Sequence, residues 1–476
     1  MSARERIAVA AALAALVAWS FAVRWSVLAA TPFPVGIDGY YYPLQLRSLL
    51  DTGHLLYPAS PLTFWLAAPF AWATDPIVGA KLAAALGGAL VAVPAYGVGA
   101  RLGRGYPAGL VAAALAAASA GSTYQSIEYV KNGIGITVAL AAVWLVLRAC
   151  ERPSRGRLIA AAVTVIAAAL AHVMAAALVV AIGAPAALAG TRRWRWLLGG
   201  ALVAAGALAL ALPQRVPTLH GLVSSTAHWS LPALTTRTFT LVLGYEAAIA
   251  GVLAIAAAVV LARNMIEQPP AERWASWACV ALGALIALPW LDVADPQGLA
   301  FRLRIVAFVP MALCAGIVTR RIPAGHRTRA ALIIALVFVV VPRDRHEGEI
   351  VAHPWMVSAA ISLAGKIPDG DTLIVSERHV AYMAAWYARV PVSLRPERIA
   401  RAHRWRLMTL DGFIGHDSPL EDALDAARAD ATVAPPLGLL ARHRDGVVLV
   451  TEPTWEWLLA HLPASARDYY ARWPTI

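Results

Sequence analysis

Long apolar segments, separated by short breaks that carry Arg or Pro, recur along the first 342 residues of the chain. Several are roughly 17 to 25 residues long, which is enough for a helix to cross a hydrocarbon core of about 30 Å. Only helices suit such segments, because a lone strand in lipid would leave its backbone groups unpaired. The pattern predicts about eleven transmembrane helices, at 7–30, 76–100, 106–121, 133–149, 158–171, 174–190, 196–212, 241–262, 274–290, 305–319 and 330–342.

Two long segments between the predicted helices lack this pattern, at 31–75 and 213–240. Within the first, residues 61–72 are apolar but too short to cross, and Trp65 and Trp72 favour a helix lying at the membrane interface. The second contains Pro, His and Ser/Thr without apolar periodicity, which is typical of a mobile surface loop. Such loops often close over a substrate.

After residue 342 charged residues become frequent, with 17 acidic and 15 basic side chains. Two strands and one helix are predicted there, at 371–376, 447–451 and 420–429. The expected fold class is therefore an all-α polytopic membrane domain over residues 1–342. A small α/β or α+β soluble domain is expected to follow over residues 343–476.

The distribution of basic residues predicts the orientation of the helices. With the N-terminus in the cytoplasm, seventeen Arg fall in the inner breaks and eight basic residues fall outside, as the positive-inside rule requires. Eleven crossings then place residues 343–476 outside, where most acids of the membrane region also lie. Because the chain has 37 Arg and only 3 Lys, we infer a GC-rich bacterial genome. The expected location is the inner (plasma) membrane of a bacterial cell envelope.

The composition excludes several classes of protein. Hydrophobic residues make up 59% of the chain and charged residues 14%, which is outside the range of water-soluble domains. The net charge of +12 would suggest a nucleic-acid partner in a soluble protein, but here it marks cytoplasmic loops, so no nucleic acid is expected. The three cysteines lie in or beside apolar segments, so neither a disulfide framework nor a Cys-based metal site is expected.

The segment just outside the first predicted helix carries the most informative polar residues. Asp38 stands in an Ile-Asp-Gly-Tyr-Tyr-Tyr run. A carboxylate there can reach a lipid phosphate through a divalent cation, or act as a general base on an acceptor hydroxyl. The alternative is an Asp-Gly turn that simply ends the helix. Tyr40, Arg47 and His54 follow as substrate-binding candidates, although Tyr40 and its neighbours also suit an interfacial aromatic belt.

A second polar break, between the third and fourth predicted helices, holds Glu128, Lys131 and Asn132. A Lys ammonium is a point charge suited to phosphate. Glu128 can simply pair with Lys131, because three residues separate them on one helical turn. If Glu128 instead faces Asp38, the two carboxylates would form an acid–base pair or hold a divalent cation such as Mg²⁺ or Mn²⁺.

Weaker candidates lie at two other outer helix ends. His172 stands in the hairpin between the fifth and sixth predicted helices, where it either binds substrate or is an ordinary hydrogen-bonded histidine. Arg302 and Arg304 precede or begin the tenth predicted helix. A charged Arg at a membrane boundary is costly unless it meets an anion or reaches the surface, so phosphate binding and snorkelling are the two interpretations.

The order and sidedness of these motifs resemble the GT-C membrane glycosyltransferases. That family includes protein O-mannosyltransferases, the lipid A aminoarabinose transferase and the catalytic subunit of oligosaccharyltransferase. The resemblance covers most of the membrane region. It rests on an acid in the first outer loop (Asp38), an Arg shortly after it (Arg47) and a Tyr-Pro-x-Ser-Pro-Leu run over residues 57–62. A polar second loop, a His at an outer helix end, an Arg beginning a late span and an outer C-terminal domain complete it.

The resemblance implies a hexosyl- or pentosyltransferase. Its substrate would be a sugar or glycan on a polyprenyl phosphate or diphosphate, and its acceptor a glycan, lipid or protein at the outer face. Asp38 would be the catalytic or metal-binding acid and Glu128 the acid of the second loop, while Lys131, Arg302 or Arg304 would stabilise the departing phosphate. Glu128 with Lys131-Asn132 departs from the Asp-x-Asp or Asp-Glu pattern of the family, which leaves the need for a cation open. The Trp-Trp-Asp signature is absent, so transfer to Asn is not expected.

Two other functions remain open at this point. An O-antigen ligase or polysaccharide polymerase would depend on Arg215, His220 and His228 and would not need Asp38. A transporter or flippase would place paired polar residues near the middle of the bilayer, and charges in the middle of the predicted spans are nearly absent. The three functions therefore predict different essential residues.

Overall fold

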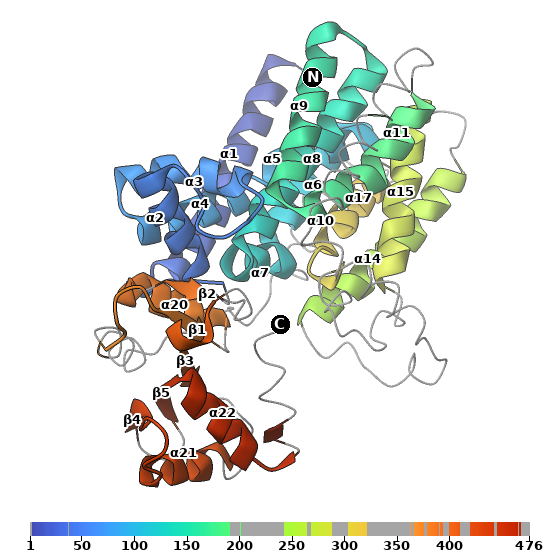
Figure 1. The fold of residues 1–476 in the computed structure, drawn as a ribbon. Helices are drawn as coiled ribbons and strands as arrows, with labels where there is room; N and C mark the ends of the chain where they lie inside the picture. Colours follow the sequence, from blue (N-terminus) through green and yellow to red (C-terminus); the bar gives the residue numbers. More distant parts are fainter. Residues whose placement is uncertain are drawn as a thin grey trace. The chain divides into compact units, whose positions relative to one another are not determined.

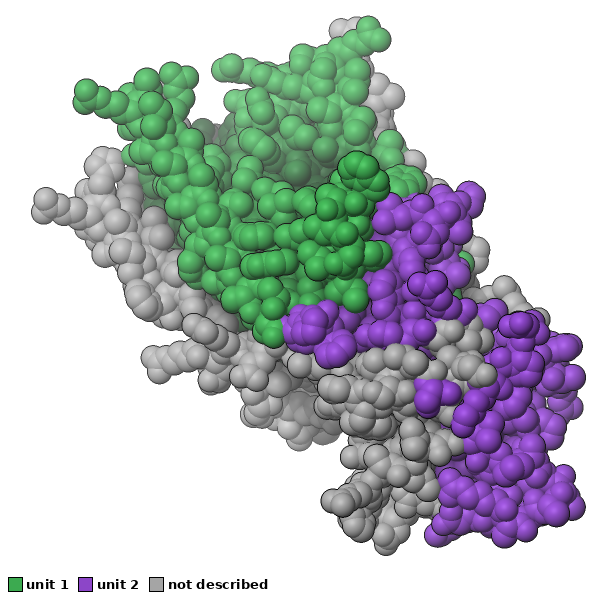
Figure 2. Space-filling view, turned by 90° about the vertical axis from the view of Figure 1, so that its left-hand side faces the viewer, with its two compact units in different colours: residues 1–30, 57–348 green, residues 31–56, 349–476 purple. Residues whose placement is uncertain are grey.

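A computed structural model gives the fold of the chain (Figure 1). It describes residues 2–36, 38–190, 200, 242–263, 268–287, 303–320, 362, 366–375, 378–389, 391–393, 399–409, 419–441, 445–464 and 466–467. The chain divides into two compact units, which Figure 2 distinguishes by colour. Unit 1 comprises residues 1–30 and 57–348, and unit 2 comprises residues 31–56 and 349–476.

Unit 1 is helical throughout its described part. Its elements are α1 (Ala3–Leu28), α3 (Leu62–Ala73), α4 (Pro76–Ala89), α5 (Ala92–Leu102), α6 (Tyr106–Ala118), α7 (Ala120–Glu128), α8 (Val130–Glu151), α9 (Arg155–Ala171), α10 (Val173–Leu178), the π-helical turn η1 (Val179–Gly183), α11 (Ala184–Ala189), α14 (Val242–Ala262), α15 (Pro270–Ala287) and α17 (Phe308–Thr319). These helices lie over nine of the eleven predicted spans. The other two, 196–212 and 330–342, fall almost wholly outside the described residues.

Local signals in the sequence account for where several of these helices begin. Ser2 and Glu5 form a reciprocal capping box at the start of α1. The Asp75 carboxylate accepts from the backbone N–H groups of Ile77 and Val78 before α4, whose first residue is Pro76. Each cap satisfies backbone donors that have no partner inside the helix.

Among the described residues, three helical stretches are long and apolar enough to cross a membrane, namely Ala3–Leu28, Pro76–Leu102 and Val130–Glu151. The second of these joins α4 and α5. The predicted interfacial helix at 61–72 is present as α3, with the side chains of Trp65 and Trp72 exposed at 53% and 81%. Its position at a membrane surface and the count of eleven spans stay predictions.

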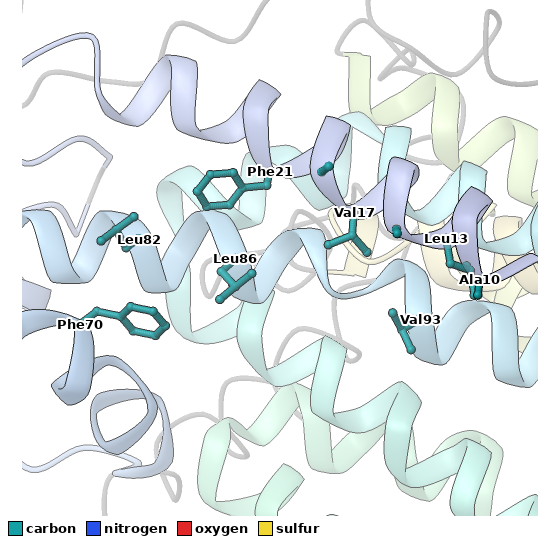
Figure 3. A pocket seen from close by; sticks show the side chains of 10 residues that line it. Ala10, Leu13, Val17, Phe21, Phe70, Leu82, Leu86 and Val93 are labelled. Carbon is teal, nitrogen blue, oxygen red and sulfur yellow. The ribbon is translucent and has the colours of Figure 1, made fainter. Parts of the chain in front are cut away.

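An apolar groove of about 770 Å³ opens between α1, α3, α4 and α5 (Figure 3). Phe21, Phe70, Leu82, Leu86 and Val93 are among its lining side chains. The lining includes none of the residues that the sequence nominates for chemistry, so the groove is separate from the candidate site.

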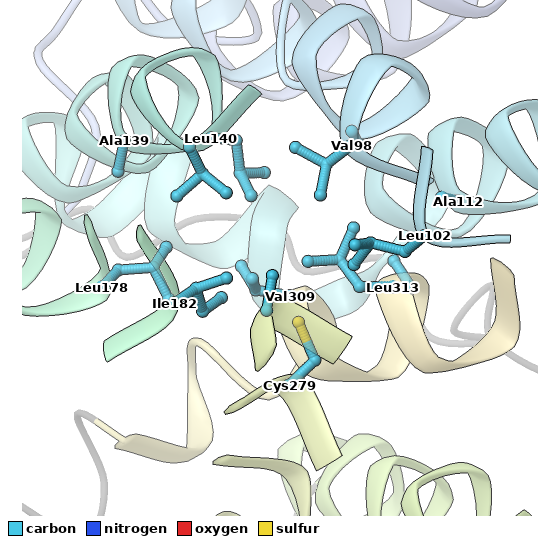
Figure 4. Packing of buried hydrophobic residues seen from close by; sticks show 14 of the residues in the cluster. Val98, Leu102, Ala112, Ala139, Leu140, Leu178, Ile182, Cys279, Val309 and Leu313 are labelled. Atoms are coloured by element: carbon cyan, nitrogen blue, oxygen red, sulfur yellow. The ribbon is translucent and has the colours of Figure 1, made fainter. Parts of the chain in front are cut away.

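The core of unit 1 is built from small and branched side chains of α5, α6, α8, η1, α15 and α17 (Figure 4). Small residues let the backbones approach closely. A Cβ added at Gly103, just after α5, would overlap the Cβ of Ala108 on α6 and the carbonyl oxygen of Gly316 on α17. These helices are therefore held by close packing.

In its described part, unit 2 contains a five-stranded sheet. Its elements are α2 (Tyr41–Thr52), β1 (Thr372–Val375), α20 (Arg378–Ala388), β2 (Val392–Ser393), the 3₁₀ turn η6 (Arg401–His403), β3 (Arg404–Thr409), α21 (Pro419–Ala429), β4 (Leu437–Ala441), β5 (Asp445–Thr451) and α22 (Glu452–His461). The strand order is β2-β1-β3-β5-β4. β1 pairs in parallel with β2 and β3, and β5 pairs antiparallel with β3 and β4.

The strands predicted at 371–376 and 447–451 and the helix predicted at 420–429 are confirmed as β1, β5 and α21. Apolar residues of β5, α21 and α22 form a core that includes Val448, Leu424 and Trp455. Residues 31–56 join this unit because α2 packs against α20. A separate soluble domain at 343–476, outside the membrane, stays a prediction.

Candidate functional site

The polar break expected between the third and fourth predicted helices is itself a helix, α7. Ser119 begins it, because its hydroxyl accepts from the backbone N–H of Ser122 at 3.1 Å. The helix ends at Glu128, since Tyr129 takes φ −131° and ψ 66° before α8 begins at Val130. The structure thus corrects the prediction of a polar loop: a capped start and buried hydrogen-bond partners allow these residues to be helical.

Arg24 of α1 is wholly buried and reaches this helix. Its Nη2 donates to the hydroxyl of Ser122 at 2.8 Å, and its Nε donates to the hydroxyl of Ser126 at 3.0 Å. Its Nη1 donates to the carbonyl oxygens of Ser20 at 3.1 Å and Ala117 at 3.3 Å. The guanidinium therefore ties α1 to one face of α7 and to the end of α6.

Glu246 of α14 is 2% exposed and binds the N-terminal end of α7. Its Oε1 accepts from the backbone N–H of Ala120 at 2.7 Å, and its Oε2 accepts from the N–H of Gly121 at 3.0 Å. The Ser119 hydroxyl donates to the same Oε2 at 2.8 Å. A carboxylate at this end of a helix is favoured, because unpaired N–H groups and the helix dipole both attract negative charge.

Gln125 connects α7 to the segment that precedes α17. Its side-chain nitrogen donates to the carbonyl oxygen of Ile305 at 2.6 Å, and the side chain is fully buried. Ile305 follows Arg304, so the backbone at Arg304 lies beside α7. Arg302 lies outside the described residues, and phosphate binding by either arginine stays a prediction.

Glu128, Lys131 and Asn132 lie at the junction of α7 and α8. Glu128 is 1% exposed and Asn132 is 8% exposed, while Lys131 is half-buried. The backbone N–H of Asn132 donates to the carbonyl oxygen of Tyr129 at 2.8 Å, which closes a tight turn between the two helices. The carboxylate of Glu128, the ammonium group of Lys131 and the amide of Asn132 thus lie within five consecutive residues that are buried or half-buried.

His172 is the residue at which α9 ends and α10 begins. Its Nδ1 accepts from the backbone N–H of Met174 at 3.1 Å, so one ring nitrogen caps α10. A Cβ at Gly135 would meet the Cβ of His172 at 3.3 Å, which places the histidine one helical turn beyond Lys131 along α8. Of the candidates in unit 1, Glu128, Lys131 and Asn132 thus lie at the α7–α8 junction, His172 lies beside Gly135 of α8, and the backbone near Arg304 lies beside α7.

Asp38 belongs to unit 2, in the turn that precedes α2. Gly36 has φ +98°, and its carbonyl oxygen accepts from the N–H of Gly39 at 2.8 Å. The Asp38 carbonyl oxygen accepts from the N–H of Tyr41 at 3.0 Å, and the residue is 8% exposed. The Asp-Gly turn is therefore present. A chemical role for the Asp38 carboxylate stays a prediction.

Tyr40 is packed inside unit 2. Its hydroxyl lies 2.9 Å from the hydroxyl of Tyr387 on α20, and the two rings meet edge to face with centroids 5.5 Å apart. Burial, and then the hydrogen bond to Tyr387, raises the pKa of the Tyr40 hydroxyl well above its ordinary value. The phenol therefore stays neutral at physiological pH.

Arg47 of α2 binds the end of α20. Its Nη1 donates to the carbonyl oxygen of Trp386 at 2.9 Å and its Nη2 to that of Ala385 at 3.0 Å. The guanidinium carbon lies 4.4 Å from the centroid of the Trp386 ring. These contacts give Arg47 a structural role in joining α2 to α20, and substrate binding stays a prediction. His54 is exposed beyond the end of α2.

The expected convergence of Asp38 and Glu128 joins residues of two different units, and it stays a prediction. The described residues contain no group of three or more His, Cys, Asp or Glu side chains placed to hold a metal ion. Mg²⁺ often takes only one or two protein carboxylates, with water and substrate phosphate oxygens completing its coordination. A cation held by Asp38 or Glu128 together with a substrate phosphate therefore stays a prediction.

Arg24, Glu246 and Gln125, which hold α7 in place, are not among the site residues predicted from the sequence. The sequence does carry a signal for Arg24, because Ser20 and Arg24 are four residues apart and form a polar stripe within the apolar stretch from Ile7 to Trp25. No comparable signal connects Glu246 to α7, since 117 residues lie between it and Glu128, the last residue of α7.

Solved structures with the same fold include oligosaccharyltransferase AglB from Archaeoglobus fulgidus. Its apo form matches with a TM-score of 0.57 and 13% identity, over 80% of this chain and 64% of that one. Its complex with an inhibitory peptide and a dolichol-phosphate matches with a TM-score of 0.56 and 12% identity, over 84% and 69%. AglB is a GT-C glycosyltransferase. The chain has the GT-C fold. The expectation drawn from the resemblance is thereby confirmed for the fold.

A chain with this fold and these apolar helices is a multi-pass membrane protein. It spans 64% of the length of the apo AglB chain, which is less than two thirds. A third AglB structure, with Zn and sulfate, matches with a TM-score of 0.56 and 12% identity, over 91% of this chain and 72% of that one.

ArnT from Cupriavidus metallidurans bound to undecaprenyl phosphate is also similar, with 15% identity over 94% of this chain and 98% of that one. Its TM-score of 0.38 is too low to support a conclusion about this chain. No protein-family model matches the sequence, and no curated protein matches it.

Proposed function

We propose that this protein is a membrane glycosyltransferase that moves a sugar or glycan from a polyprenyl phosphate or diphosphate to an acceptor on the outer face of the membrane. The GT-C fold supports the general class of reaction. The observation that carries the proposal is the junction of α7 and α8, where Glu128 and Lys131 lie three residues apart. One turn before Glu128, Gln125 binds the backbone at Ile305, and one turn after Lys131, Gly135 lies beside His172. The junction offers a carboxylate and cationic groups in one water-poor region.

Sugar transfer from such a carrier requires the protein to stabilise two changes of charge. The acceptor hydroxyl must be oriented and must lose its proton as the new glycosidic bond forms, and the carrier must leave as an anion. In this proposal Asp38 accepts the proton of the acceptor hydroxyl. Lys131 and Arg304 stabilise the negative charge that develops on the departing phosphate, and Glu128 orients the reacting groups.

A divalent cation fits the same proposal. AglB has been solved with Zn and sulfate, which supports the idea of a cation-assisted site in proteins of this fold. In this chain Asp38 or Glu128 would hold the ion together with phosphate oxygens of the carrier. The chemistry that it would supply is neutralisation of the phosphate charge.

The Asp38→Asn variant tests whether Asp38 accepts the proton of the acceptor hydroxyl. The purified protein would be incubated with undecaprenyl phosphate carrying a radiolabelled hexose or pentose, and with a membrane extract as the source of acceptor. Transfer of label would be followed in the lipid, glycan and protein fractions. Loss of a general base is expected to lower the rate by roughly 10²- to 10⁴-fold.

Asp51→Asn is the matched control, because Asp51 is an exposed acid on α2 of the same unit. We expect this variant to keep the wild-type rate. Full activity in Asp38→Asn would remove Asp38 from the mechanism. No transfer by the wild-type protein from any polyprenyl-phosphate sugar would reject the function itself.

The ligase or polymerase alternative depends on Arg215, His220 and His228, which lie outside the described residues. An alanine scan of these three residues distinguishes it from the proposed function. If the scan abolishes activity while Asp38→Asn retains it, the ligase alternative is favoured.

A further inference from the structure

The sequence of helix α7 would not by itself form a stable helix. It has nine residues, Ala-Gly-Ser-Thr-Tyr-Gln-Ser-Ile-Glu, and most of them are small or polar. Isolated helices of this length are marginal even in favourable sequences. Yet Ser122, Gln125, Ser126 and Glu128 are each at most 3% exposed. Contacts with the rest of unit 1 must therefore determine where this helix lies.

Two buried charges supply contacts of complementary kinds. Glu246 binds the N-terminal end of α7 through the N–H groups of Ala120 and Gly121, which fixes the helix along its axis. Arg24 binds Ser122 and Ser126, which lie one turn apart on one face, and this fixes the rotation of the helix about its axis. An axial and a rotational constraint together determine the place of the last residue.

A third contact supports the same geometry from another face. Gln125 donates to the carbonyl oxygen of Ile305, which ties α7 to the segment that carries Arg304. Gly121 also packs closely there, because an added Cβ would meet both Glu246 Oε2 and the carbonyl oxygen of Ile305 at 2.9 Å. The helix is thus held between α1, α14 and the segment that precedes α17.

Charged partners restrict the helix more than neutral ones would. Hydrogen bonds to a guanidinium or a carboxylate are shorter and stronger than neutral bonds. A displaced α7 would leave Arg24 and Glu246 buried without their partners, and an unpaired buried charge is among the most unfavourable features a protein can contain. Alternative placements of α7 are therefore strongly disfavoured.

We infer that Arg24 and Glu246 are positioning residues for sugar transfer: they lock α7 so that Glu128 and the α7–α8 junction meet the substrate in one fixed geometry. This inference rests on the proposed function. Neither residue needs to touch substrate, because each acts through the helix that ends at Glu128.

Conservative variants test the inference without removing polar character from the core. Glu246→Gln keeps the size of the side chain but places an amide nitrogen against α7, and Arg24→Lys removes the forked donor set. The matched controls are Glu272→Gln and Arg101→Lys. Arg101 is partly buried in unit 1 and pairs with Glu151 at 2.7 Å and with Glu272 at 3.8 Å.

The first readout is amide hydrogen exchange of the full-length protein in lipid nanodiscs, which does not depend on any activity. Peptides that cover residues 119–132 are expected to exchange about tenfold faster in Glu246→Gln and Arg24→Lys, because the local opening of α7 becomes easier. Exchange in the rest of unit 1 should stay at the wild-type rate, as should exchange throughout both controls. The inference would be overturned if exchange became faster across the whole of unit 1, or if the rate in residues 119–132 did not change.

The second readout is a kinetic double-mutant cycle with Glu128→Gln, using the labelled undecaprenyl-phosphate sugar as donor. Misplacing a reacting group by about 1 Å can cost about 100-fold, so Glu246→Gln should lower kcat by roughly 10- to 100-fold with little change in KM. In the Glu128→Gln background the same change should alter kcat by less than about twofold, because the residues act through one another. Additive losses in the cycle would contradict positioning through Glu128.

The two readouts separate the inference from the function on which it rests. If the wild-type protein transfers no sugar, the proposed function fails, and a confined exchange response would still show that the two charges lock α7. If transfer occurs but exchange and kcat are unchanged in both variants, the function stands and the positioning inference is wrong.

Discussion

Helices α6 and α7 follow one another with only Ser119 between them, yet different forces hold them. In α6 every residue from Ala108 to Ala118 except Leu110 is buried, and the helix packs through Gly and Ala against α5 and α17. In α7 the buried side chains are mainly polar, and they bind Arg24 and the backbone near α17, while the first backbone N–H groups of the helix bind Glu246. Within one unit, close packing of small residues therefore holds α6, whereas hydrogen bonds to buried charged groups hold α7, the helix that carries Glu128.

The contrast has a physical basis. Apolar contacts between membrane helices have little directional preference, because lipid tails are as apolar as the helices themselves. Hydrogen bonds to a buried charge are directional, and breaking them leaves a charge without a partner. The packing of α6 therefore tolerates small shifts of the helix, whereas few other positions of α7 would keep its hydrogen bonds.

Removing one buried charge is expected to have the largest effect. Arg24→Ala leaves a cavity and leaves the hydroxyls of Ser122 and Ser126 without their donor, and it should lower the free energy of unfolding of unit 1 by about 2–5 kcal/mol. Detergent-based unfolding, monitored by fluorescence in micelles, measures the change. Arg101→Ala is the control, because its ion pair with the partly exposed Glu151 should contribute only about 0–1 kcal/mol. If both variants lost the same free energy of unfolding, the contacts of Arg24 with α7 would contribute no more to stability than a surface ion pair.

Overpacking at the α5–α6 contact should have a smaller effect. In Gly103→Ala the new methyl group meets Ala108 and the backbone of Gly316, and the expected destabilisation is about 1–3 kcal/mol. The same unfolding assay applies. At Gly156 on α9 an added Cβ meets nothing within 4 Å, so Gly156→Ala should instead stabilise the helix by about 0.5–1 kcal/mol. Destabilisation by both substitutions would contradict the packing argument.

The smallest effect is expected at a polar contact in unit 2 that water can reach. The Asp371 carboxylate accepts from Trp405 Nε1 at 2.8 Å and lies 2.7 Å from Nδ1 of His403. These partners, Trp405 first, hold the pKa of Asp371 below its ordinary value. A lowered pKa in the folded state stabilises the fold above the unfolded-state value of about 3.9 and loses that contribution as the pH falls through the folded-state value.

Acid titration of the full-length protein checks this expectation. Hydrogen exchange in β1 and β3, corrected for the intrinsic effect of pH, should accelerate below about pH 4 in the wild type, since protonation removes the carboxylate acceptor. Asp371→Asn should show a smaller acceleration over the same range. An identical acid response in the two proteins would show that Asp371 does not couple to the stability of the sheet.

Much of the helical architecture followed from the sequence because its signals are local. Apolar length located the helices, and an apolar run after a Pro-Asp-Gly turn located β1. The GT-C resemblance rested on the order of motifs such as Asp38 and the 57–62 run, and the fold agrees with it.

The site was only partly accessible in this way. Glu128, Lys131 and Asn132 were found because polar residues are rare in an apolar chain, but their break was predicted to be a loop. Its helical state depends on Arg24, about a hundred residues earlier, and on Glu246, more than a hundred residues later. No local propensity reports such partners, because the free energy that makes α7 a helix comes from tertiary contacts.

The sequence by itself thus determined that this chain is a helical membrane protein with polar residues collected at a few helix ends. Composition and periodicity suffice for that, because the transfer of apolar side chains out of water depends on the residues themselves. Tertiary structure alone decided that residues 31–56 join the C-terminal elements and that two buried charges meet on α7. Burial of a charge is acceptable only where a folded environment supplies its partners, and that environment is a property of the whole chain.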